Sequence, residues 1–217
     1  MAARKRPSRE ARERREEASL RSLRAAARDC HACDLWRSAT QTVFGEGPAH
    51  AAVMLVGEQP GDTEDKRGLP FVGAAGQVLD RALADAGVAR ENVYLTNVVK
   101  HFKFQQRGKR RMHQRANAEE QAACRQWLDA ELARVKPRAI VCLGAVAAHA
   151  LLGASFRLLE QRGRWQQMGE GMRAFATVHP SYLLRLRDAD REPAYQDFVR
   201  DLRQIAELAG NINSDSN

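Results

Sequence analysis

Four apolar runs are spaced along the chain, and each is followed by a polar or glycine-rich turn. They are AAVMLVGE (51–58), NVYLTNVV (92–99), RAIVCLGA (138–145) and MRAFATVH (172–179). All four are apolar almost throughout, instead of alternating between apolar and polar residues. This pattern predicts short strands that are buried on both faces of a sheet.

Segments with helical character separate these runs. They cover residues 16–29, 73–87, 117–135, 146–153 and about 192–209. Strands that alternate with helices are typical of a parallel sheet covered on both faces. We therefore expect an α/β fold with three layers, αβα, around a central, mostly parallel four-stranded sheet. We also expect a basic, flexible arm at 1–16, one domain over 17–210 and a disordered tail at 211–217.

Composition fits a globular protein, with 44% apolar and 29% charged residues in a chain of 217. The length suits one sizeable domain. No apolar run is long enough to cross a bilayer, and the N-terminal sequence lacks the apolar core of a signal peptide. We expect a cytoplasmic, nucleoid-associated bacterial protein.

The net charge of +8 is concentrated in two segments. Residues 1–28 carry ten Arg or Lys against four Glu, and residues 100–115 carry seven cations and no acid. Such a distribution is typical of a face that binds a polyanion. For the first segment, a solvated helix with Glu–Arg pairs is the alternative.

Polar side chains stand at the ends of three of the predicted strands. These are Glu58, Asn97 and His179. In an open parallel sheet the carboxyl ends of the strands form the edge where ligands bind, so we expect the three to meet in one crevice. The basic segment leaves the same edge after Asn97, which places GKRRMH (108–113) over the mouth of the crevice. A histidine among cations is held toward its neutral form, which is a nucleophile or a base.

Other residues near this edge have a functional and a structural interpretation. Phe71 is either an aromatic that stacks on a planar ligand or a core phenylalanine. The turn GEQPGDTED (57–65) either offers a carboxylate to a reacting centre or is an acidic surface turn. Asn97 is a reader of a base edge or a strand-end cap, and His179 is an oxyanion donor or a satisfied core histidine. Ser181 begins a predicted helix whose N-terminus could face a phosphate.

Four cysteines leave two interpretations open. Cys30 and Cys33 form a C-x-x-C pair, whereas Cys124 and Cys142 lie far along the chain. If they converge in space, four thiolates suit zinc or an iron–sulfur cluster. Cys142 is otherwise a small apolar residue of a buried strand.

Together these features resemble a known family. With GEQPG, GLPFVG, TNVVKHFKF, GKRRMH, TVHPSYLLR and the four cysteines, the chain resembles UdgX-type uracil-DNA glycosylases over about residues 28–205. These are relatives of the iron–sulfur family 4 uracil-DNA glycosylases. The resemblance implies the uracil-DNA glycosylase fold and a substrate of uracil-containing DNA, single-stranded or duplex. It implies a [4Fe–4S] cluster held by Cys30, Cys33, Cys124 and Cys142. We expect a monomer.

The resemblance also assigns roles to single residues. It implies that the enzyme excises uracil and that His113 then becomes covalently linked to C1′ of the abasic site. The implied catalytic residues are His113, Glu58 and His179. The implied substrate-binding residues are Gln59, Asp62, Phe71 and Asn97, and the implied DNA-binding residues are Lys109, Arg110, Arg111, Ser181 and Arg185.

Three alternatives remain at this point. The first is a conventional family 4-type uracil-DNA glycosylase that turns over by means of a Glu58-activated water. The second is a non-catalytic iron–sulfur module that binds nucleic acid, and the third is a zinc-bound enzyme that processes nucleotides.

Overall fold

A mostly parallel sheet lies at the centre of the computed structural model, which describes residues 9–169 and 171–210. The strand order is β2-β1-β5-β7-β6. The strands are β1 (Val53–Gly57), β2 (Val93–Asn97), β5 (Ala139–Leu143), β6 (Gln166–Gly169) and β7 (Met172–Thr177). Strands β2, β1, β5 and β7 pair in parallel, and β6 pairs with β7 in the antiparallel direction. The predicted sheet is confirmed, with one strand more than expected.

The additional strand β6 is absent from the apolar pattern for a physical reason. Its sequence is QQMG, its residues are exposed or half-buried, and it pairs with one neighbour only. An irregular register between Gln167 and Gly169 shortens the pairing further. A short edge strand faces solvent, so it needs no apolar run to form.

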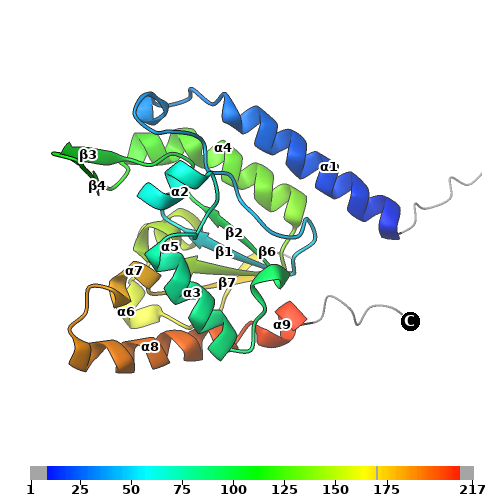
Figure 1. Cartoon of the computed structure of the whole chain (residues 1–217). Helices are drawn as coiled ribbons and strands as arrows, with labels where there is room; N and C mark the ends of the chain where they lie inside the picture. Colours follow the sequence, from blue (N-terminus) through cyan, green and yellow to red (C-terminus); the bar gives the residue numbers. More distant parts are fainter. Residues whose placement is uncertain (1–8, 170, 211–217) are drawn as a thin grey trace, which may run out of the picture.

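Helices cover both faces of the sheet (Figure 1). On one face α1 (Arg9–Arg28), α4 (Ala118–Val135) and α5 (Ala145–Leu152) pack on strand residues such as Met54 and Val56. On the other face α3 (Ala74–Asp85) and α8 (Asp188–Arg203) pack on residues such as Val53 and Leu55. Successive side chains of one strand thus enter opposite cores, which explains why the runs are apolar throughout. The three-layer αβα architecture is confirmed.

The remaining helical segments are short. They are η1 (Asp34–Arg37), α2 (Asp62–Arg67), η2 (Arg90–Asn92), α6 (Leu158–Gln161), α7 (Pro180–Leu183) and α9 (Ala206–Gly210). Helices α2 and α7 follow β1 and β7 within a few residues, so both begin at the carboxyl edge of the sheet. The single helix expected at 192–209 is divided between α8 and α9.

A two-stranded hairpin projects beside this edge (Figure 1). It consists of β3 (Phe104–Arg107) and β4 (Arg110–His113), with Phe104 opposite His113. Gly108 opens its two-residue loop with a φ of 57°, a backbone conformation that favours glycine at the first loop position. The GKRRMH segment is therefore the second half of a hairpin, which carries His113 at its base.

The expected arm at 1–16 and the expected tail at 211–217 cannot be compared fully with the structure. Residues 1–8 and 211–217 lie outside the described residues, and α1 begins at Arg9. The boundary at residue 17 stays a prediction. Within the described part of the chain, no helix is both long enough and apolar enough to cross a membrane.

Candidate active site and cysteine group

The carboxyl edge of the sheet brings Asn97 and Phe71 together around Gly57. Gly57 ends β1 and lies opposite Asn97, the last residue of β2. A Cβ atom added to Gly57 would lie 2.4 Å from Asn97 Oδ1 and 2.6 Å from Phe71 Cζ. Glycine is therefore required here, because any side chain would fill the space that Asn97 and Phe71 face. Among the described residues, no hydrogen bond engages the Asn97 side-chain amide, so both its donor and its acceptor remain available.

The Phe71 ring is held in place through an unusual backbone. Its φ of 53° is rare for a bulky residue and costs conformational energy. The Arg90 guanidinium donates to the carbonyl oxygens of Pro70 and Phe71 at 3.2 and 3.1 Å. Glu64 Oε1 accepts from the N–H groups of Val72 and Gly73 at 3.0 and 2.7 Å. These contacts over-determine the turn and keep the ring at the site.

His179 faces Phe71 and is fixed as a neutral donor. The two ring centroids lie 6.2 Å apart. His179 Nδ1 accepts from the Ser181 N–H at 3.2 Å and lies 2.8 Å from Ser181 Oγ. Burial, assisted by the charges of Arg185 and His113, lowers the pKa of His179 to about 4. The ring is thus uncharged at neutral pH and carries its proton on Nε2, from which it can donate.

Ser181 and Arg185 act on His179 in this structure. Arg185 Nη1 donates to Ser181 Oγ at 3.2 Å, and the Ser181 hydroxyl in turn donates to the imidazole. The Ser181 N–H is also occupied by His179, and α7 spans four residues only. Contact of these two residues with DNA stays a prediction.

Gln59 connects the hairpin to the loop that follows β1. Its amide nitrogen lies 2.9 Å from His113 Nε2 and donates to the main-chain oxygens of Gln114 and Lys103 at 2.8 and 3.2 Å. Because an amide nitrogen only donates, His113 Nε2 is the acceptor in this contact, and the two N–H groups of Gln59 are shared among three acceptors. His113 Nε2 is therefore turned toward Gln59, the residue that follows Glu58, while the residue as a whole remains exposed.

Two side-chain oxygens of this loop are buried without a partner. Glu58 Oε1 and Gln59 Oε1 each lack a hydrogen-bond partner within the described residues. Buried polar atoms are almost always satisfied, so an unpaired one indicates a group that a ligand or water completes. The loop thus offers two unpaired acceptors, one of them on Gln59, whose amide nitrogen contacts His113.

The three cations of the GKRRMH segment have different environments. Lys109 and Arg110 are exposed, whereas the Arg111 side chain is 15% exposed and pairs with Asp62 and with the fully buried Asp65, at 2.6 Å from Asp65. The Arg111 guanidinium also lies over the rings of Phe104 and Phe102, at 4.9 and 5.4 Å from their centroids. Arg111 therefore anchors the hairpin to α2. Because its charge is already paired with two carboxylates, it is poorly suited to bind a phosphate.

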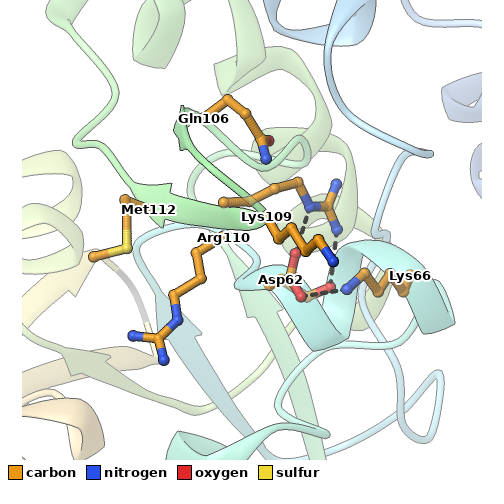
Figure 2. A pocket seen from close by; sticks show the side chains of 7 residues that line it. Asp62, Lys66, Gln106, Lys109, Arg110 and Met112 are labelled. Carbon is orange, nitrogen blue, oxygen red and sulfur yellow. Dashed lines mark hydrogen bonds and ion pairs between the residues drawn. The ribbon is translucent and has the colours of Figure 1, made fainter.

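A cavity of about 460 Å³ opens between α2 and the hairpin (Figure 2). Figure 2 shows Asp62 ion-paired to Lys66, with Lys109 and Arg110 on the hairpin side. Burial opposes ionisation of Asp62, but hydrogen bonds from Lys66 and Arg111 more than offset this and lower the Asp62 pKa. This cavity is distinct from the space around Gly57. Its surplus of cations suits a phosphate and not a neutral base.

The cysteine group (Cys30, Cys33, Cys124 and Cys142) lies on the α1/α4 side of the sheet. Burial raises the pKa of Cys33 and of Cys124, and the nearby Cys30 adds to the rise in both, with Cys33 adding to that of Cys124, so the three thiols lie close together. Trp127 Nε1 donates to Cys30 Sγ at 3.1 Å, and the Lys100 N–H donates to Cys124 Sγ at 3.2 Å. Cys142, on β5, is fully buried and belongs to the same core cluster as Cys124.

Four cysteines from separate elements are a donor set that fits a [4Fe–4S] cluster. Burial raises the pKa of Cys124 to about 11 and that of Cys142 to about 12, so an apolar surrounding disfavours free thiolates there. Within the described residues no three His, Cys, Asp or Glu side chains are gathered so that they could hold one metal ion. A [4Fe–4S] cluster binds each cysteine through a different iron, which spaces the sulfurs more widely, and N–H donors to the sulfurs are typical of such sites.

Comparison with known proteins decides the family. A model of the uracil DNA glycosylase superfamily matches residues 44–203. The chain belongs to the uracil DNA glycosylase superfamily. It is 40% identical over 161 residues to the type-4 uracil-DNA glycosylase of Thermotoga maritima, covering 74% of this chain and 80% of that protein. It is 37% identical over 191 residues to the type-4 enzyme of Pyrobaculum aerophilum, covering 84% and 91%. The type-4 enzyme of Archaeoglobus fulgidus is 34% identical over 188 residues, covering 83% and 88%.

In this superfamily member, sequence reasoning missed several residues that support the site. Glu64, Arg90, Lys100 and Glu131 contact the predicted site residues or their neighbours. Each looked like an ordinary charged residue of a helix or loop, and only the fold brings it under the site. Glu64 alone had a usable signal, because it lies three residues after Gly61 and its carboxylate accepts from the Gly61 N–H at 3.1 Å as a helix-start residue does.

Proposed function

We propose that this uracil-DNA glycosylase excises uracil from DNA and stays bonded to the product through His113. The observation that carries the proposal is the 2.9 Å contact between Gln59 and His113 Nε2, which turns the imidazole toward the Glu58 loop at the carboxyl edge of the sheet. Excision itself follows from the family. Retention of the DNA is the step that the hairpin adds.

An extruded uracil would be read by three of the residues described above. Phe71 offers a ring face for stacking. The unengaged Asn97 amide can donate to uracil O4 and accept from N3–H, whereas cytosine reverses both partners and would leave buried groups unpaired. His179 donates from Nε2 toward O2, where negative charge develops as the base leaves.

The bond changes balance when His113 attacks with its proton on Nδ1. The C1′–N1 bond breaks and its electron pair leaves with uracil, whose charge His179 stabilises. The lone pair on His113 Nε2 forms the new bond to C1′, for which Gln59 must release its contact. The ring is then cationic and can lose the Nδ1 proton to Glu58 or to solvent. An imidazole bonded to carbon leaves poorly, so the adduct persists.

We also propose that the cysteine group holds a [4Fe–4S] cluster. Cys30 and Cys33 would attach the segment after α1 to Cys124 on α4 and Cys142 on β5. When bound, the cluster supplies a cross-link and no redox step on the substrate. The chain's own contribution is the pair of N–H groups, from Trp127 and Lys100, that donate to the sulfurs.

Denaturing electrophoresis tests the trapping step. The protein is incubated with uracil-containing single-stranded DNA, and we expect a band of protein joined to DNA that survives heat and detergent. His113→Ala should abolish that band. His149→Ala is the matched control, because His149 contacts the Phe156 carbonyl outside the site. A full-strength adduct in His113→Ala would show that a residue other than His113 is the nucleophile.

Conventional turnover is the second candidate, and two observations favour it. The relatives named above are type-4 uracil-DNA glycosylases, and Glu58 Oε1 is an unpaired buried acceptor that could orient a water at C1′. Counting released uracil separates the candidates. Trapping predicts about one uracil per protein molecule, whereas turnover predicts many, together with free abasic DNA.

A further inference from the structure

A fully buried ion pair lies between the site and the cysteine group. Lys100 Nζ and Glu131 Oε2 are 2.6 Å apart, and neither side chain has exposed surface. Removing two charges from water is costly, and buried pairs persist only where further hydrogen bonds complete them. A pair this deep therefore raises the question of what it does for the molecule.

Hydrogen bonds account for the charged atoms of the pair. The Lys100 ammonium donates to Glu131, to Thr96 Oγ1 at 2.6 Å and to the Asn97 carbonyl oxygen at 2.7 Å. The Glu131 carboxylate also accepts from the Gly45 N–H at 2.9 Å and from the Tyr94 hydroxyl at 3.1 Å. Helix α4, strand β2 and the loop before β1 thus meet at one carboxylate.

The two ends of the short segment Asn97–Lys100 reach different parts of the molecule. Asn97 stands at the carboxyl edge with its amide unengaged, and the ammonium of Lys100 returns to the Asn97 main chain. The Lys100 N–H meanwhile donates to Cys124 Sγ at 3.2 Å. A single segment therefore joins the edge where the base is read to the cysteine group.

We propose that Lys100 and Glu131 are positioning residues for base recognition. Their ion pair fixes the main chain at Asn97, so that its amide presents both hydrogen-bonding groups to the base at the correct angle. This inference rests on the proposed role of Asn97 as the reader of uracil. Small displacements of a group that orients a substrate have large effects on rate, so loss of the pair should slow excision even in a stable protein.

The decisive variant replaces both charges together. Lys100→Met with Glu131→Leu removes the pair but leaves apolar side chains of similar size, an exchange that is often neutral for stability. Here we expect the double variant to fold and to keep its iron content near the parental value, but to melt at a lower temperature, because the Gly45 N–H and the Thr96 and Tyr94 hydroxyls lose their acceptor. We expect it to bind uracil-free DNA as the parent does, and to release uracil at least about tenfold more slowly at saturating DNA. Parental uracil release by the folded double variant would overturn the inference.

Matched controls separate positioning from general stability. Arg162 and Asp201 form a second ion pair, at 2.7 Å, which is only partly buried. It contacts neither Asn97 nor the cysteine group. Arg162→Met with Asp201→Leu should keep uracil release within about twofold of the parent. If the Lys100 double variant does not fold, Glu131→Gln decides. It keeps the shape and an acceptor but removes the charge, and unchanged uracil release by it would equally overturn the inference.

Asn97→Ala, measured in parallel, separates this inference from the proposed function. Release of uracil is the readout, so the result does not depend on whether His113 traps the product. Normal release by Asn97→Ala would contradict the reading role itself, and the inference with it. An inactive Asn97→Ala beside a fully active Lys100 double variant would contradict the positioning role alone.

Discussion

The two imidazoles of the candidate site have different hydrogen-bonding roles at Nε2, and a neighbour fixes each one. The Ser181 N–H occupies Nδ1 of His179 and leaves a donor at Nε2. The Gln59 amide donates to Nε2 of His113 and leaves the ring's lone pair there. One histidine is thereby prepared to donate and the other to attack. Sequence could predict which histidines matter, but their tautomers depend on contacts that only the fold creates.

Replacing His179 by glutamine should flatten the acid side of the stability profile. The folded-state pKa of His179 is about 4, below its ordinary value of 6.5. Between these values the unfolded chain binds a proton that the folded chain does not. Stability is therefore lost as the pH falls through this window, by up to about 1.4 kcal/mol per pH unit from this residue. Chemical denaturation of parent and variant across the window measures the difference in slope.

His149→Gln is the control for that experiment and should retain the parental slope. Because glutamine at position 179 can still accept the Ser181 N–H, the variant should fold. An equally steep slope in His179→Gln would assign the acid titration to another group.

Gly57→Ala should remove activity while leaving the fold largely intact. The added methyl would lie 2.4 Å from Asn97 Oδ1 and 2.6 Å from Phe71 Cζ, so it must displace the two groups proposed to hold the base. Overpacking of this kind costs about 1–3 kcal/mol in stability. We expect uracil release to fall at least about 100-fold. Gly210→Ala, where an added Cβ meets no atom within 4 Å, should behave as the parent.

At the scale of elements, the hairpin of β3 and β4 adds His113 and a group of cations to the carboxyl edge of the sheet. The hairpin's residues are mostly polar and exposed, so the sequence has no alternating apolar pattern that would predict these strands. Only Gly108 indicates a turn. The central strands were predictable because burial on both faces leaves long apolar runs. Strand β6 and the hairpin were not, because both lie at the surface. The place of Asn97 at the end of a central strand followed from the pattern, whereas the anchoring of Arg111 depends on α2 and on its packing over Phe102 and Phe104.

Arg111 and Arg110 offer a matched test of what the hairpin cations do. Arg111→Ala deletes the contacts with Asp62 and Asp65, so the hairpin loosens and adduct formation at saturating DNA should slow by at least about tenfold. Arg110→Ala removes an exposed cation. It should weaken DNA binding and reduce the salt slope by about one, with the rate at saturation unchanged. Salt-dependent anisotropy and single-turnover kinetics measure the two effects.

If Arg111→Ala and Arg110→Ala weakened DNA binding equally, and Arg111→Ala left the rate of adduct formation unchanged, the anchoring role of Arg111 would be contradicted. Arg111 would then be a phosphate contact like Arg110. Lys66, which lines the same cavity from α2, should resemble Arg110 in this assay.

On the scale of the whole molecule, the proposed cluster would join two parts of the chain, one outside and one inside the region that matches the superfamily. The matched region begins at residue 44, so α1, Cys30 and Cys33 precede it, whereas Cys124 and Cys142 lie inside it. Helix α1 packs on α4, and apart from this packing the segment is tied to the matched domain by contacts such as the Arg24 guanidinium donating to the Gly45 oxygen at 2.8 Å. A cluster on all four cysteines would fasten the preceding segment to the shared domain.

Cys30→Ser should therefore loosen this segment before it affects the sheet. We expect the purified parent to contain about four irons per chain and to absorb broadly in the visible range, and the variant to lose most of both. Without the cross-link, α1 should become the first site of limited proteolysis, and the melting temperature should fall. Trp127→Phe is the matched control, because it keeps an aromatic ring but deletes the N–H donor to Cys30. It should retain iron and resist the protease. A colourless parent, or a Cys30→Ser variant with parental iron, would show that these cysteines hold no such cluster.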